Sequence, residues 1–302
     1  MCGIAGAINN GKGRLTPSTL RKMAVGIEAR GRHAYGVSWI DTDNRVRMHK
    51  SVGPISKFID GIIESMISPR VVIFHTRWAT HGDATANENN HPHPCDGGWI
   101  VHNGQIPNYL DVIDEYGLLT SSDCDSEILG LLMPEFQGTL LERMAATVDQ
   151  CDQTAPLCMA GIWSNPTRLG LVKRGNPLFI GTGSSGNVYF SSCTTGLPGK
   201  PRPLEDNGGM VFTYGQGATA IDVLPYEESS KVFAGSDSFD DEDASEDAEP
   251  IDWFDDDEMS EAEKWRAQAI QNIAQRSGDE GIIEHASKSH PWGKARKKRR
   301  PR

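Results

Sequence analysis

The second residue of the chain is a cysteine, in the opening stretch MCGIAGAINNG. Methionine is removed readily before small side chains, and its loss would leave a thiol and a free α-amine together on Cys2. An ordinary cysteine has a pKa of about 8.5 and an α-amine one of about 7.7–8.0. The amine is therefore partly neutral near neutral pH and can act as the base for its own thiol. The alternative is that Cys2 has no chemical role and is simply a small apolar residue at the start of a strand.

Three further stretches carry side chains that could bind or activate a substrate. HTRWATHG (75–82) follows an apolar run, and VHNGQI (101–106) leads from a strand into a turn at Asn103 and Gly104. CDSE (124–127) begins a helix with a carboxylate. Each has an ordinary structural alternative. Asn-Gly is a common hairpin turn, an aspartate before a helix is a common cap, and an arginine can form a weak surface ion pair.

The periodicity of apolar residues predicts the elements that must position these side chains. The helix over 17–29 is expected to have Thr16 as its cap and Pro17 in its first turn. The order of strands, then helices, then a run of strands predicts a sandwich in which helices cover antiparallel sheets. Strands are expected at 2–9, 35–40, 45–50, 70–76, 157–164, 168–174, 177–181, 187–192, 209–214 and 218–224, and helices at 17–29, 55–66, 107–116, 125–135 and 138–150.

Together with MCGI, these motifs resemble the glutaminase domain of the class II glutamine amidotransferases. HTRWATHG and RGNPLFIG (174–181) are most similar to the glutaminase domain of glutamine–fructose-6-phosphate aminotransferase. The resemblance runs from Cys2 to about Val223. It implies an α+β fold over residues 1–226, the four-layer αββα sandwich of N-terminal nucleophile hydrolases. It also implies hydrolysis of L-glutamine to glutamate and ammonia.

The resemblance implies a role for each matching residue. Cys2 would be the nucleophile that forms a γ-glutamyl thioester, and Asn103 with Gly104 would form the oxyanion hole. Arg77 would bind the α-carboxylate of glutamine through its forked guanidinium, and Asp125 would accept the α-ammonium group. The loop that closes over glutamine would supply three more residues, namely Trp78 as a gating aromatic, Thr80 and His81. For Trp78 the alternative is packing in the core.

The sequence predicts neither a metal ion nor a cofactor. His81, His91 and His93 are of a type that binds metals, but no carboxylate or cysteine stands at a matching spacing. GTGSSG (181–186) fits a GxGxxG pattern, yet a strand follows it where a dinucleotide site needs a helix. The six cysteines form no CxxC pair, and the chain shows no secretion signal. We therefore expect reduced thiols and a cytoplasmic protein.

One motif departs from the family pattern. In ARGRHAYG (29–36), Arg30 and Gly31 are kept, whereas His33 and Ala34 replace an Asp-Ser pair. The change bears on the geometry of this loop and on contacts with a partner.

The last quarter of the chain has a different composition. The chain has a net charge of −11, and residues 227–302 contribute −8 of it through 20 acidic and 12 basic residues. An acidic low-complexity linker is expected at 227–259, a short helix at 260–277 and a basic tail at 278–302. A solvated spacer is the simpler interpretation of this quarter. The alternative is a docking arm whose basic end contacts nucleic acid or another anion.

The sequence also bears on where the ammonia goes. No sugar-isomerase-sized module and no SGGxDS-like loop accompany the glutaminase motifs, so we expect an ammonia-accepting synthase in trans. No apolar run approaches the roughly 20 residues that cross a bilayer, so no membrane contact is expected. Two other functions stay open: an N-terminal nucleophile amidohydrolase acting on another amide, and a catalytically silent scaffold of the same fold. Arg77 and Asp125, which could hold both ends of an amino acid, favour free glutamine.

Overall fold

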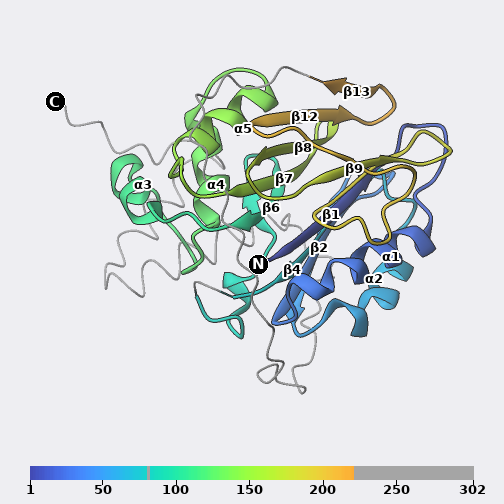
Figure 1. Ribbon diagram of the computed structural model, residues 1–302, viewed down its shortest axis with the longest axis horizontal. Helices are drawn as coiled ribbons and strands as arrows, with labels where there is room; N and C mark the ends of the chain where they lie inside the picture. Colours follow the sequence, from blue (N-terminus) through green and yellow to red (C-terminus); the bar gives the residue numbers. More distant parts are fainter. Residues whose placement is uncertain (80–81, 221–302) are drawn as a thin grey trace.

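Two antiparallel β-sheets face each other, and helices cover their outer faces (Figure 1). The computed structural model describes residues 1–79 and 82–220. The linker expected at 227–259, the helix at 260–277 and the basic tail at 278–302 lie outside these residues. Within the described residues no helix is both long and apolar enough to cross a membrane.

The first sheet holds the amino end of the chain near its centre, because β1 pairs with β10 on one side and with β4 on the other. All six residues of β1 are buried, since the sheet is covered on both faces. In spatial order the strands are β11 (Arg202–Pro203), β9 (Phe179–Thr182), β10 (Val188–Ser191), β1 (Gly3–Ile8), β4 (Val71–Arg77), β2 (Ala34–Ile40) and β3 (Val46–Val52).

The second sheet carries VHNGQI at the end of one of its strands. β6 pairs with β7 along its whole length, from Gly98 opposite Trp163 to Gly104 opposite Leu157. In spatial order the strands are β13 (Gly217–Ala220), β12 (Gly208–Thr213), β8 (Thr167–Arg174), β7 (Leu157–Ser164), β6 (Gly98–Gly104) and β5 (His93–Cys95).

The helices form the two outer layers. The first sheet is covered by α1 (Pro17–Gly26) and α2 (Ile59–Ser65), and the second by α3 (Tyr109–Tyr116), α4 (Glu127–Leu132) and α5 (Leu140–Asp149) (Figure 1). Short 3-10 turns lie at Glu28–Arg30, Ile55–Lys57, Asn87–Asn89 and Met133–Glu135.

The core consists of three apolar layers. Successive strand residues point to opposite faces, so Ile4 of β1 packs between the sheets, with Val101 among others, while Ala5 packs under α1 with Met23. A third layer, which includes Met144 of α5, fills the space between the second sheet and its helices. The predicted αββα sandwich is therefore confirmed.

Several predicted boundaries were wrong for identifiable reasons. Thr16 does precede α1, but its hydroxyl bonds Thr19 Oγ1 and makes no side-chain cap to the backbone. The helix expected at 55–66 is a 3-10 turn followed by α2. Asn103 and Gly104 are the last residues of β6, because pairing with β7 carries the strand through a sequence that favours a turn. The short strand β5 was not predicted.

Gly36 of β2 gives a test of how tightly this fold packs. A Cβ atom there would lie 1.8 Å from the carbonyl oxygen of His91, whereas one on Gly61 of α2 would meet nothing within 4 Å. Gly36→Ala should lower the free energy of unfolding by about 1–3 kcal/mol through overpacking. Gly61→Ala, at an exposed helical position, should raise it by about 0.5–1 kcal/mol. Urea denaturation of both variants checks this, and equal effects would contradict the packing described.

Candidate active site

Cys2 is held against the residue that follows β4. The antiparallel register sets Gly3 opposite Thr76. The Trp78 N–H therefore donates to Cys2 Sγ at 3.4 Å, and that sulfur lies 3.6 Å from the Trp78 carbonyl oxygen. Arg30 Nε donates to the Cys2 carbonyl at 2.9 Å. The start of the chain is thus fixed by hydrogen bonds at the end of β1, near the centre of the first sheet.

The surroundings of Cys2 favour the protonated thiol over the thiolate. Burial raises the pKa of the thiol, against the hydrogen bond from Trp78 and the positive charges of the amino terminus and Arg77, while the charge of Asp125 raises it further. Burial also lowers the pKa of the terminal amine of Met1, as does the charge of Arg30. Both shifts have burial as their main cause, because burial disfavours the charged form of each group.

Asn103 presents a buried amide whose side chain has no partner within the part of the chain described. The residue is fully buried, and neither its Nδ2 nor its Oδ1 atom finds a hydrogen bond. Its main chain is well held, because Asn176 Nδ2 donates to the Asn103 carbonyl at 2.8 Å and to Pro156 O at 3.1 Å. Buried polar groups are normally satisfied. The Asn103 amide therefore leaves both a donor and an acceptor unpaired among the described residues.

The alternative that Arg77 forms a weak surface ion pair is wrong, because the residue is buried. It is 3% exposed, and its guanidinium donates to Asn90 Oδ1 at 2.7 Å, Gly82 O at 3.1 Å and Asp83 O at 3.3 Å. These three acceptors are uncharged oxygens of the loop after β4. The loop therefore orients the guanidinium.

Asp125 joins the end of β6 to the start of α4. Its Oδ2 atom accepts a hydrogen bond from the Ile106 N–H at 2.8 Å, two residues after Gly104. Its Oδ1 atom accepts from Ser126 Oγ at 3.1 Å. The N-cap residue of α4 is Ser126, so the interpretation of Asp125 as that helix's cap is wrong. The carboxylate instead fixes the segment beside Asn103 and Gly104.

Glu127, which sequence reasoning missed, holds the loop before Asp125. Its buried carboxylate accepts hydrogen bonds from the N–H and hydroxyl groups of both Ser121 and Ser122, at 2.6 to 3.1 Å. Hydrogen bonds to a charged group are worth about 1.5–3 kcal/mol each. The SSDCDSE sequence, with two serines ahead of the glutamate, was the available signal.

Residues of the altered ARGRHAYG motif contact the segment around Arg77 and Trp78. A Cβ atom on Gly31 would lie 2.4 Å from the Arg77 carbonyl carbon, so this approach requires glycine. The Ala79 N–H donates to His33 Nδ1 at 3.1 Å, and the His33 and Trp78 rings lie 4.6 Å apart. His33 therefore positions the half-buried Trp78, which does not belong to the core. Thr80 and His81 lie outside the described residues.

The two sheets meet at buried histidines next to the candidate site. Nε2 of His75 in β4 lies 3.2 Å from the His102 carbonyl oxygen. His75 is two residues before Arg77, and His102 is one residue before Asn103. Together with the pairing of β1 with β4, this contact brings the strand ends near Cys2, Arg77 and Asn103 into one region.

A second group of side chains was not predicted from spacing. Cys124 lies beside His91 and His93, although it is about 30 residues away from them in the sequence. Within residues 1–79 and 82–220, these three are the group whose ligand atoms lie close enough to hold a metal ion.

The chain is similar in sequence to one class of enzyme. It is 33% identical over 204 residues to a glutamine–fructose-6-phosphate aminotransferase of Aquifex aeolicus, a match covering 66% of this chain and 33% of the relative. It is 32% identical over 205 residues to that of Idiomarina loihiensis, covering 66% and 33%. The chain thus spans about a third of the length of these curated relatives. No family model matches it.

Solved structures share the fold at low identity. A glutamine phosphoribosylpyrophosphate amidotransferase from B. subtilis, complexed with ADP and GMP, has a TM-score of 0.62 at 19% identity, covering 74% of this chain and 49% of its own. A glutamine aminotransferase class-II domain protein from Silicibacter pomeroyi has a TM-score of 0.52 at 14% identity, covering 74% and 100%. At these identities the likeness is one of fold.

The buried His102 makes stability depend on pH. Burial lowers its pKa to about 4, from an ordinary value of 6.5. Between these values the unfolded chain binds a proton that the folded chain does not, so stability decreases as the pH is lowered, by up to about 1.4 kcal/mol per pH unit. His102→Asn should reduce this slope by about that amount between about pH 6 and pH 5, as measured by urea denaturation. An unchanged slope would show that His102 does not titrate as described.

Proposed function

The chain carries a class II glutamine amidotransferase domain, and on that premise we propose that it hydrolyses glutamine to glutamate and ammonia through Cys2. One observation carries the proposal above the others. The Cys2 sulfur accepts a hydrogen bond from the N–H of Trp78, the residue that follows the buried Arg77, so the nucleophile lies beside the group that would bind the α-carboxylate of an amino acid.

Removal of Met1 would precede the reaction and free the α-amine of Cys2. The freed amine takes the proton of the Cys2 thiol, and the sulfur attacks the side-chain amide carbon of glutamine. The negative charge that develops on the amide oxygen is stabilised by the Asn103 side chain and the Gly104 N–H, which form the oxyanion hole. The buried Asn103 amide, without a partner in the described region, supports this role.

Two steps would complete the turnover. The carbon–nitrogen bond breaks, the leaving nitrogen takes up the proton held by the amine, and ammonia departs from a γ-glutamyl thioester. Water then attacks the thioester carbon and gives its proton back through the amine, which regenerates the thiol and releases glutamate. Arg77 would bind the α-carboxylate and Asp125 the α-ammonium group throughout, while Trp78, Thr80 and His81 close over the substrate.

We propose further that the ammonia passes to an acceptor synthase. The relatives are named as aminotransferases that act on fructose 6-phosphate, which favours a sugar phosphate as acceptor over a modified nucleobase. Co-purification with the full chain tests this step. Full glutaminase turnover by the isolated chain, with no partner bound, would argue against an obligate acceptor.

Substitution of the two reacting groups should separate chemistry from binding. Cys2→Ala should abolish glutamate formation and labelling by a diazo-ketone analogue of glutamine. Asn103→Leu should lower kcat by about 10²–10³ with little change in KM, because an oxyanion donor acts mainly in the transition state. Cys193→Ser, at a half-buried cysteine of another layer, is the matched control and should keep both activity and labelling.

The alternatives predict different outcomes of the same assays. Retained Met1 together with no turnover would favour a silent scaffold. Labelling of Cys2 without glutamine hydrolysis would favour an amidohydrolase that acts on another amide. Full activity of Cys2→Ala would overturn the proposal.

The role of Arg77 can be tested through substrate discrimination. Arg77→Lys keeps the charge but loses the forked geometry, so KM for glutamine should rise roughly 10- to 100-fold, the equivalent of one charge-assisted hydrogen bond. KM for the derivative whose α-carboxylate is replaced by an amide should change little. Steady-state kinetics with both substrates measures this. An equal rise for both would mean that the variant disturbs the loop after β4 and does not remove a carboxylate contact.

A further inference from the structure

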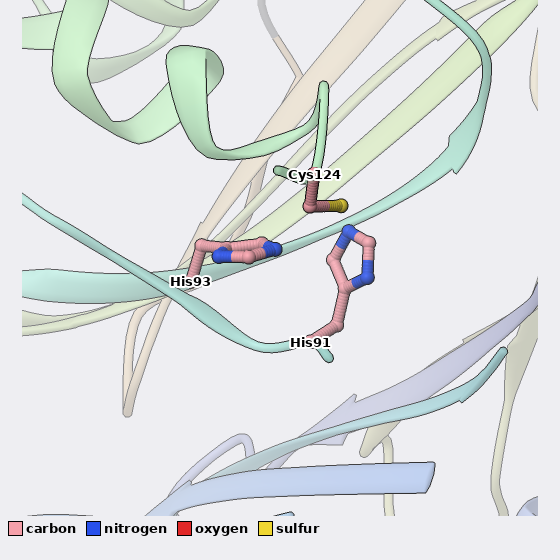
Figure 2. Close-up of side chains that lie close together, drawn as sticks. All are labelled: His91, His93 and Cys124. Atoms are coloured by element: carbon pink, nitrogen blue, oxygen red, sulfur yellow. The ribbon is translucent and has the colours of Figure 1, made fainter. Parts of the chain in front are cut away.

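Three buried side chains with metal-binding atoms converge beside the candidate active site. His91 lies just before β5, His93 is the first residue of β5, and Cys124 comes from the loop before α4 (Figure 2). The ligand atoms of the three all lie within 4.8 Å of one another. Each side chain is at least nine-tenths buried.

The two histidines offer nitrogen atoms that the surrounding described residues leave without a partner. Neither ring nitrogen of His91 has one, and neither does Nε2 of His93. Cys124 Sγ lies 3.8 Å from Asp125 Oδ1, the distance of a weak contact. Buried polar atoms are normally satisfied by protein, water or an ion. A metal ion at this cluster would accept the lone pairs of these nitrogen and sulfur atoms.

The segments that carry the three residues are already fixed relative to one another. Asp123 N donates to Asn89 Oδ1 at 2.8 Å, which joins the loop before α4 to the segment before β5. The ring of His91 stacks on that of His75 with 4.0 Å between centroids. The backbone therefore needs little rearrangement to bring the three ligand atoms together.

We propose that His91, His93 and Cys124 bind one zinc ion, with water or a small anion in the fourth position. Imidazole nitrogen and thiolate sulfur are the ligands that Zn²⁺ prefers, whereas Mg²⁺ and Ca²⁺ prefer oxygen. Zinc bonds of about 2.0–2.1 Å to nitrogen and about 2.3 Å to sulfur place tetrahedral ligand atoms about 3.3–3.7 Å apart. Small side-chain rotations achieve this from the present separations.

Binding the ion is a proton exchange with no change of oxidation state. The Cys124 S–H bond is lost, one proton is released to solvent, and the sulfur binds the ion as thiolate. Because Cys124 precedes Asp125, the ion would also hold the loop that carries the proposed acceptor of the substrate ammonium. That consequence rests on the proposed function, whereas the metal site itself does not.

Cobalt(II) substitution tests the site directly. The probe is Co²⁺ added to the metal-free full chain in a Cys2→Ala background, which removes the thiol at the amino terminus as a competing ligand. We expect one equivalent of Co²⁺ to bind with a thiolate-to-cobalt charge-transfer band and the intense visible bands of a four-coordinate ion, and Zn²⁺ to displace it. Equilibrium dialysis should give one zinc per chain.

Two variants and a control assign the ligands. Cys124→Ser should remove the charge-transfer band, and His93→Gln should weaken binding at least about tenfold. Cys95→Ser, at another buried cysteine, should keep the band. Circular dichroism shows whether each variant folds. The proposal is overturned if the Cys2→Ala chain binds no Co²⁺, or if the band survives in Cys124→Ser. Glutamine turnover decides neither result, so this test and that of the proposed function fail separately.

Discussion

The structure depends on the antiparallel pairing of β1 with β4. Because a strand's side chains alternate, a slip of one residue would turn Cys2 to the other face and separate it from Trp78. The register is fixed by burial on both faces of β1, with Ile4 between the sheets and Ala5 under α1. The packing of the core thereby determines where the first thiol of the chain lies.

Several buried polar groups have no partner among the residues that the structure describes. The Asn103 amide and several buried histidine nitrogens are without hydrogen bonds in the described residues. Such groups cost stability when buried. Their neighbours hold them firmly, as Asn176 holds the main chain of Asn103 and Glu127 holds the loop before Asp125. Rigid support around unsatisfied groups is what a preorganised binding site requires.

The sequence predicted the layers of the fold and most of the strands, because long periodic segments record which face is buried. It predicted less well where tertiary pairing overrides local preference, as where Asn103 and Gly104 extend β6 in place of a turn. It also missed contacts between residues that are distant in the chain. The approach of Cys124 to His91 and His93 depends on packing of α4 and its preceding loop against β5, which no spacing rule contains. The roles of Arg77, Asn103 and Asp125 remain predictions that rest on resemblance and on the surroundings described.

The account's central claim is that Cys2 carries a γ-glutamyl group during turnover. Acid-quenched mass spectrometry of the mature wild-type chain mixed with glutamine tests it most directly. The account predicts an amino-terminal peptide that lacks Met1 and is heavier by one γ-glutamyl group on Cys2, and a loss of that group when the thioester is left to hydrolyse. Glutamate formation with an unmodified Cys2, or with the adduct on another cysteine, would contradict it.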